Sequence, residues 1–164
     1  MELLRQSTRI CFLTTLLVCD YWSNVGLMDS FIEEIKVDGS IAAIIVRSGF
    51  NPDGIQFVTP DDYSQQLGYM RRPAGYVIQP HVHLRVDRKA SLTQEVLFVR
   101  KGRVRVDFYR NDESYVESCE ITTGDVILLS TGGHGFEMME ESEIIEVKQG
   151  PYMDDKRRFI PKTM

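Results

Sequence analysis

The stretch GYVIQPHVHLRVDRKASLTQEVLFVRKG, from Gly75 to Gly102, contains two of the chain's three histidines, His81 and His83. A single residue separates them in an apparent strand. Side chains at positions i and i+2 of a strand point to the same face, about 7 Å apart. Two imidazoles at that spacing can bind one metal ion, because neutral imidazole is the commonest metal ligand among side chains. The stretch therefore predicts a metal site, although a histidine in an apolar strand is more often a structural residue.

Two further candidates follow along the chain. Glu95 opens a second strand-like run, EVLFVRKG, and His134 follows an apolar run in GDVILLSTGGHGFE. Gln94 is a rival to Glu95, but a carboxylate partly neutralises a buried cation and is therefore favoured. Glycines Gly132 and Gly133 permit a bend in the chain just before His134.

These residues resemble the two motifs of the cupin family. The first motif matches Gly75, His81, His83, Glu95 and Gly102, and the second matches Gly124, Gly132 and His134. The chain departs from the family pattern at several points. Eleven residues lie between His83 and Glu95 where three or four are common, Ser130 replaces a proline, His134 comes one residue early, and Met138 replaces a frequent asparagine. The resemblance covers about residues 75–150.

The resemblance implies a cupin-type jelly-roll barrel with one divalent transition metal ion, either Fe, Mn, Ni or Zn. The implied ligands are His81, His83, Glu95 and His134. We prefer ligation to a structural role because all three histidines fall at motif positions. An open metal position would suit an isomerase, an epimerase or a dioxygenase acting on a sugar or a carbonyl acid. Three alternatives stay open: His134 acting as acid–base without metal, a non-catalytic sugar- or metal-binding module, and a metal-free storage or scaffold protein.

Residues that share a face with the implied ligands would line a substrate pocket. Phe136 and Met138 are the candidates with the parity of His134, and Tyr76, Gln79 and Lys148 are added as polar candidates. Phe136 and Met138 have the strand parity of His134, so core packing explains them equally well. Lys148 lies two residues after Glu146, and the two form either a buried pair serving a ligand or, by slight preference, an ordinary surface pair.

The rest of the pattern is all-β, with short strands at regular spacing. We predict strands over residues 31–37, 41–47, 55–58, 75–83, 95–100, 103–109, 114–121, 126–129, 136–139 and 144–148. Asp38-Gly39 and Lys101-Gly102 are predicted hairpin turns. Val104, Val106 and Phe108 alternate with polar residues and should face the core. One short helix is predicted near residues 60–67, with Thr59 as its N-cap.

Composition predicts a single-domain protein, and the cupin resemblance implies a small-molecule ligand. The chain has 164 residues and a formal net charge of −5, which argues against a nucleic-acid partner. We divide it into residues 1–27, a cupin β-barrel domain over 28–155 and a polar tail over 156–164. The apolar run at 10–19 is too short for a stable membrane span. Residues 1–27 are either a poor signal-like peptide or, as we favour, an over-extended gene start.

The expected setting is cytoplasmic, since the three cysteines form no disulfide framework. A homodimer is the default assembly for an exposed-edge jelly roll. The ending EVKQGPY is similar to small cupins of bacterial polysaccharide gene sets, which implies a role in polysaccharide biosynthesis by association alone.

Overall fold

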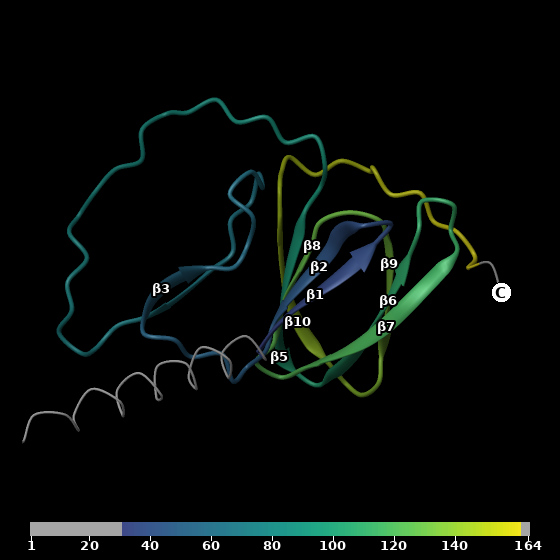
Figure 1. Cartoon of the computed structure of the whole chain (residues 1–164), viewed down its shortest axis with the longest axis horizontal. Helices are drawn as coiled ribbons and strands as arrows, with labels where there is room; N and C mark the ends of the chain where they lie inside the picture. The colour runs from purple at the N-terminus through teal and green to yellow at the C-terminus, as the bar shows by residue number, and fades with distance from the viewer. Residues whose placement is uncertain (1–30, 162–164) are drawn as a thin grey trace, which may run out of the picture.

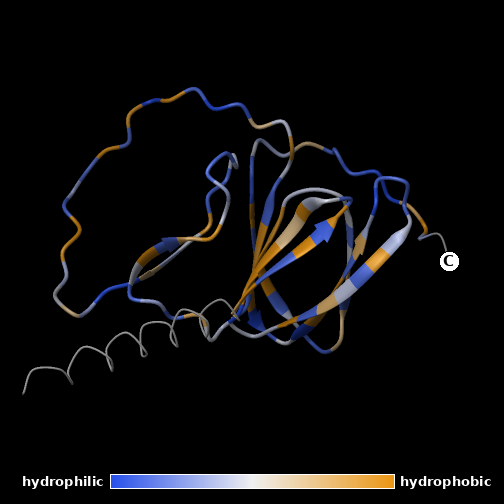
Figure 2. Ribbon diagram, in the orientation of Figure 1, coloured by the Kyte–Doolittle hydropathy of each residue, from blue (hydrophilic) through white to orange (hydrophobic). Residues whose placement is uncertain are grey.

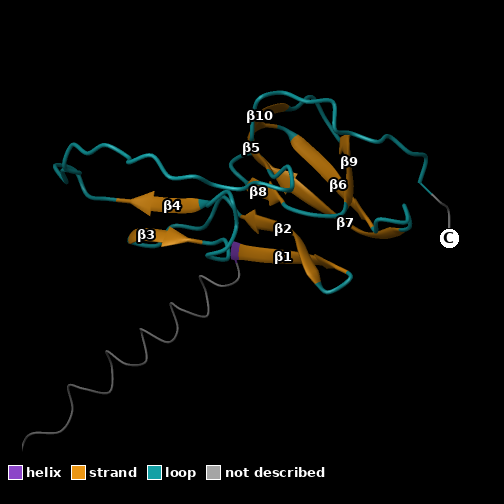
Figure 3. Cartoon of the chain, turned by 90° about the horizontal axis from the view of Figure 1, so that it is seen from above, coloured by secondary structure: helices purple, strands orange, loops and turns teal. Residues whose placement is uncertain are grey.

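The computed structural model describes residues 31–161, and nearly all regular structure among them is antiparallel β (Figure 3). The predicted segment 1–27 and the last three residues of the predicted tail lie outside this range. The described strands are β1 (Ile32–Val37), β2 (Ser40–Val46), β3 (Gly54–Phe57), β4 (Gly68–Arg71), β5 (Glu95–Lys101), β6 (Arg103–Tyr109), β7 (Tyr115–Thr122), β8 (Val126–Leu129), β9 (Gly133–Met138) and β10 (Glu143–Lys148).

Two sheets form the body of the protein (Figure 1). The five-stranded sheet has the order β1-β2-β8-β5-β10, and the three-stranded sheet has the order β7-β6-β9. Their inner faces bury one hydrophobic cluster that draws residues from both sheets. The all-β prediction is confirmed, but these sheets do not close into a barrel. Within residues 31–161 we find no helix of the length and apolarity that a membrane crossing requires.

The first hairpin forms where the sequence predicts it. Asp38 and Gly39 have φ angles of 50° and 79°, so both central residues adopt the left-handed conformation that suits a tight hairpin. The turn joins β1 to β2, and β2 lies between β1 and β8. This central position explains the apolar composition of β2, whose Ala43, Ile44 and Ile45 are fully buried.

The predicted alternation in β6 is also confirmed. Val104 and Val106 are fully buried, and Phe108 is 1% exposed. The intervening Arg105 and Asp107 point to the other face, where they form an ion pair with 2.9 Å between Nε and Oδ1. A strand with a period of two therefore supplies one wall of the core.

The predicted hairpin around Lys101-Gly102 is wrong. β5 pairs with β8 and β10, whereas β6 pairs with β7 and β9. The chain thus crosses from one sheet to the other at Gly102, which has a φ of 94°. Both strands bury one face, and packing these faces against each other covers more apolar surface than placing the strands side by side.

Gly102→Ala should destabilise the crossing between the sheets by about 2 kcal/mol or more. A Cβ there would combine an unfavourable φ with a position 2.6 Å from the carbonyl oxygen of Glu141. Gly39→Ala is the matched control, because Gly39 has a φ of 79° but no atom within 4 Å of its Cβ position. Urea denaturation should show the larger loss for Gly102→Ala, and equal losses would contradict the close approach.

The predicted helix over residues 60–67 is absent. One turn starts, with the Tyr63 amide donating to the Pro60 carbonyl over 3.1 Å, and then the chain leaves the helical path. Side chains take the amides that would continue the helix: Gln94 Oε1 accepts from the Gln65 amide, and Thr59 Oγ1 accepts from the Leu67 amide. These tertiary hydrogen bonds therefore override the local capping signals that predict a helix.

The predicted strand over residues 75–83 is also absent. Residues 72–93, which we call the arm, have no regular strand or helix, and each of them is exposed. Figures 1 and 3 show the arm leaving the β3–β4 ribbon, looping outward and returning to the body at β5. The alternating side chains have no neighbouring strand here, and a strand needs a partner for its backbone groups.

Candidate functional site

A buried carboxylate and an imidazole meet where the two sheets come together. Glu95 is the first residue of β5 and shares its inward face with Leu97 and Val99, so the residue is only 5% exposed. His134 lies on β9, directly opposite Phe108 of β6. His134 Nε2 lies 3.2 Å from Glu95 Oε2. The pair therefore joins the five-stranded sheet to the three-stranded sheet.

Two lysines contact the other oxygen of Glu95. Lys148 of β10 is the cross-strand neighbour of Glu95, and its Nζ lies 3.4 Å from Oε1. Lys156, on the segment after β10, places its Nζ 3.3 Å from the same oxygen. Lys148 also contacts Glu146 Oε1 at 2.6 Å, so it bridges the site to the β10 surface. These contacts stabilise the buried carboxylate in its charged form.

The surroundings set the charge of the pair. Burial acts to raise the pKa of Glu95, but Lys156, His134 and Lys148 outweigh it, so this pKa lies below its ordinary value. Burial lowers the pKa of His134, and the opposing effect of Glu95 does not cancel it. At neutral pH the pair is therefore a carboxylate accepting from a neutral imidazole. Protonation of Nε2 leaves a lone pair on Nδ1, which suits a general base.

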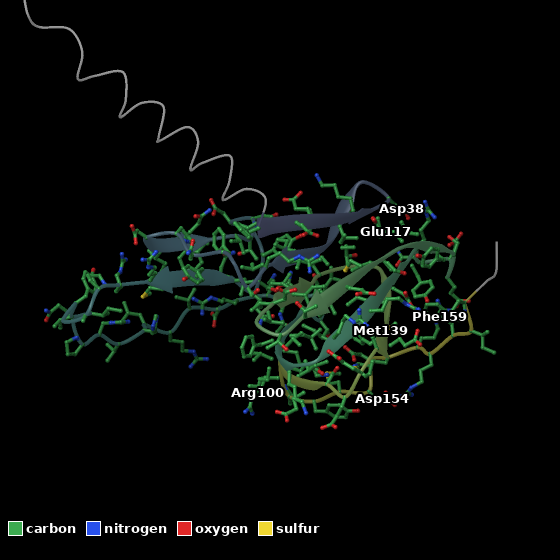
Figure 4. The ribbon with its side chains drawn as sticks, turned by 90° about the horizontal axis from the view of Figure 1, so that it is seen from below. Asp38, Arg100, Glu117, Met139, Asp154 and Phe159 are labelled. Carbon is green, nitrogen blue, oxygen red and sulfur yellow. The ribbon has the colours of Figure 1, made fainter. Side chains whose placement is uncertain are left out.

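A cavity of about 530 Å³ opens beside this pair. One wall comes from Glu95, Tyr109 and the glycine-rich start of β9, and the other comes from residues 155–161. Phe159 packs edge-on against Tyr109, with ring centroids 5.3 Å apart. Figure 4 labels Phe159 and Asp154 on this C-terminal segment, which runs along the body. A second cavity of about 290 Å³ shares Thr93, Gly132 and His134 with the first.

The structure brings together two of the four predicted metal ligands. Glu95 and His134 are in contact, whereas His81 and His83 lie on the exposed arm with their rings 5.2 Å apart. Among residues 31–161, no group of three or more His, Cys, Asp or Glu side chains could hold a metal ion. Lysine ammonium groups already neutralise Glu95. The four predicted ligands, as the structure places them, therefore do not fit a bound metal.

Some of the predicted pocket residues lie at the site, and the others lie on the arm. The sequence slightly favours an interpretation of Lys148 and Glu146 as a surface pair. Lys148 also contacts the buried Glu95, which that interpretation does not include. Phe136 packs with its ring centroid 5.4 Å from that of His134, and Met138 follows on the same face. Tyr76 and Gln79 lie on the exposed arm.

Sequence reasoning missed the contribution of the C-terminal segment. Lys156 lies in the run Lys156-Arg157-Arg158, at the start of the predicted polar tail. Tyr109 and Phe159 were not singled out as pocket residues. The only signal that could have found Lys156 is the concentration of positive charge in a short tail, which also occurs on ordinary surfaces.

Comparisons of the chain with protein-family models, with curated proteins and with solved structures find no significant match. The residues of the site itself therefore indicate its chemistry.

Glu95→Gln should lower the pKa of His134 further below its ordinary value. The negative charge of Glu95 favours the imidazolium, so its removal leaves burial less opposed. An NMR titration of the His134 ring, assigned with a His134→Gln variant, measures this pKa. Glu34→Gln on β1 is the control and should leave it unchanged. An unchanged or raised pKa in Glu95→Gln would contradict the 3.2 Å contact.

Proposed function

We propose that this protein is a cupin-type enzyme that binds a small polar metabolite beside Glu95 and His134 and moves a proton on it. The observation that carries the proposal is the buried carboxylate–imidazole pair at the edge of a cavity of about 530 Å³. In this proposal the two facing sheets are the walls of an open jelly roll. Glu95 orients His134, and His134 Nδ1 takes or returns a proton.

The cavity lining indicates the class of metabolite. Lys156, Arg157 and Arg158 are consecutive cations on its wall, opposed by Glu95 and Asp155. Among the described residues Lys156 pairs with Glu95 and Arg157 pairs with Glu113, so Arg158 is the cation of this wall that stays available for a carboxylate or a phosphate group of a ligand. Tyr109 and Phe159 supply an apolar wall. A carbonyl acid or a phosphorylated sugar fits this combination, and proton transfer next to a carbonyl is the chemistry of isomerases and epimerases.

Solvent deuterium incorporation tests the proposal. The full chain would be incubated in D₂O with sets of 2-oxo acids, sugars and sugar phosphates, and the carbon-bound hydrogens followed by NMR. We expect exchange next to the carbonyl of at least one compound, reduced by about 10²-fold or more in His134→Ala and Glu95→Gln. Glu137→Gln on the same strand is the control. Saturable binding with no exchange in any variant would instead favour the non-catalytic binding module.

A metal-dependent form is the second candidate, because Glu95 and His134 are two of the four metal ligands that the cupin resemblance implies. It requires His81 and His83 to reach the pair. It predicts about one equivalent of a transition metal in the untagged chain, lost in His81→Ala/His83→Ala. The metal-free proposal predicts that exchange continues after chelation. Plasma mass spectrometry before and after chelation separates the two.

A further inference from the structure

The arm has the properties of a strand without its partner. Residues 72–93 are exposed without exception, and they include seven large apolar side chains: Tyr76, Val77, Ile78, Val82, Leu84, Val86 and Leu92. Figure 2 shows apolar and polar residues alternating along it. Val82, Leu84 and Val86 alternate with His81, His83 and Arg85. So much contiguous apolar surface is unusual on a soluble monomer, as is so long an irregular loop.

The body has a partly uncovered apolar edge. β9 and β10 are edge strands of their sheets, and among the described residues each pairs on one side only. They lie close together, because His134 of β9 and Lys148 of β10 both contact Glu95. Phe136 and Met138 lie opposite the buried Val106 and Val104 and so face inward, yet they are 38% and 51% exposed. The inner face of β9 is therefore uncovered. We call the inner face of β9, with Phe136 and Met138, together with the adjoining edge of β10, the seam.

The charges of the arm and the seam are complementary. The arm has four basic side chains against one acidic one. Residues 133–147, which include the seam strand β9 and most of β10, have five glutamates and no lysine or arginine. Arg105, Lys101 and Arg100 of neighbouring strands neutralise part of that charge. The whole chain is acidic at −5, so a basic arm reduces repulsion between two copies.

We infer that the arm of one copy inserts into the seam of a second copy, adding a strand to its β9 edge. In a two-fold dimer the same exchange occurs twice, so both arms and both seams are covered. An extended arm of this length spans up to about 70 Å, enough to reach another body and return. Main-chain hydrogen bonds to β9 supply the affinity, and Val82, Leu84 and Val86 cover Phe136 and Met138.

The exchange would add an apolar wall to the site in trans. An arm strand that covers Phe136 and Met138 with Val82, Leu84 and Val86 places these side chains on the face that His134 shares, whereas His81 and His83 take the opposite face. Each site then combines the body of one copy with the arm of its partner. This consequence rests on the proposed function, whereas the exchange itself does not.

Oligomeric state is the first test, measured by light scattering on the full chain. We expect a dimer for the unaltered chain and a monomer for Val82→Glu/Leu84→Glu, because charged residues cannot cover the seam. Ile160→Glu is the control, since Ile160 is an apolar residue with 90% exposure outside the arm, and it should stay dimeric. A monomeric parent chain, or a dimer that survives the arm substitutions, would overturn the inference.

Isotope-resolved cross-linking then determines which body receives the arm. Copies labelled with ¹⁵N and unlabelled copies, each with a photo-cross-linker in place of Leu84, would be mixed during refolding. Cross-links between arm and β9 peptides of opposite isotope are the expected result. Links found only within one isotope would show that the arm closes on its own body and would overturn the exchange. Neither result depends on turnover, so failure here is distinct from failure of the proposed chemistry.

Discussion

Asp125→Ala is expected to lower the free energy of unfolding by about 3 kcal/mol. Asp125 is 2% exposed, and its carboxylate accepts from the Ser48 amide at 2.8 Å and the Thr122 amide at 3.0 Å. It also contacts Arg47 Nη1 at 3.0 Å. Alanine would leave two amides without their acceptor. Arg47 keeps its contact with Glu33, which limits the loss.

Urea denaturation of the full chain measures this loss. Asp53→Ala is the matched control, because the Asp53 side chain is 93% exposed and would lose only a contact of 3.5 Å with Arg71. Its effect should stay within about 0.5 kcal/mol. Similar losses in the two variants would show that Asp125 does not tie the end of β2 to the turn before β8.

Phe108→Ala should cost about 3–5 kcal/mol, the usual range for truncating a buried phenylalanine. Phe108 is the largest fully buried side chain of the core and lies opposite His134 across the β6–β9 ladder. The cavity left behind would lie directly under the candidate site. We therefore expect the NMR signals of His134 to shift as well.

Phe98→Ala is the matched control for this second variant. Phe98 lies on β5 with 39% exposure, on the face opposite to Leu97 and Val99. Its truncation removes little buried surface and should cost about 1 kcal/mol or less. Thermal and urea unfolding give both values. A Phe98→Ala loss as large as that of Phe108→Ala would contradict the placement of the core between the two sheets.

Local pattern predicted the strands well where burial alone sets them. The alternation of Val104, Val106 and Phe108 identifies their inward face, and Asp38-Gly39 identifies a tight turn, since both features depend on neighbouring residues only. Lys101-Gly102 carries an equally good turn signal but joins two different sheets. A turn residue specifies a local φ angle, whereas the partner of each strand depends on which faces pack together.

The candidate site was only half visible in the sequence for the same reason. Motif spacing selected Glu95 and His134, which do meet. It also placed His81 and His83 in a strand, whereas the arm is irregular and exposed. A strand needs a partner for its backbone, and periodicity in one segment does not supply that partner.

The amino-acid sequence by itself determined the all-β class and the inward faces of the core strands, and its motif spacing selected Glu95 and His134. Only the tertiary structure decided which strands share a sheet, that Lys148 and Lys156 neutralise Glu95, and that the inner face of β9 is uncovered. The physical reason is the distance along the chain over which each interaction acts. Alternation, turns and caps act over a few residues, whereas sheet pairing and buried ion pairs join residues such as Glu95 and Lys156 that are far apart in the chain.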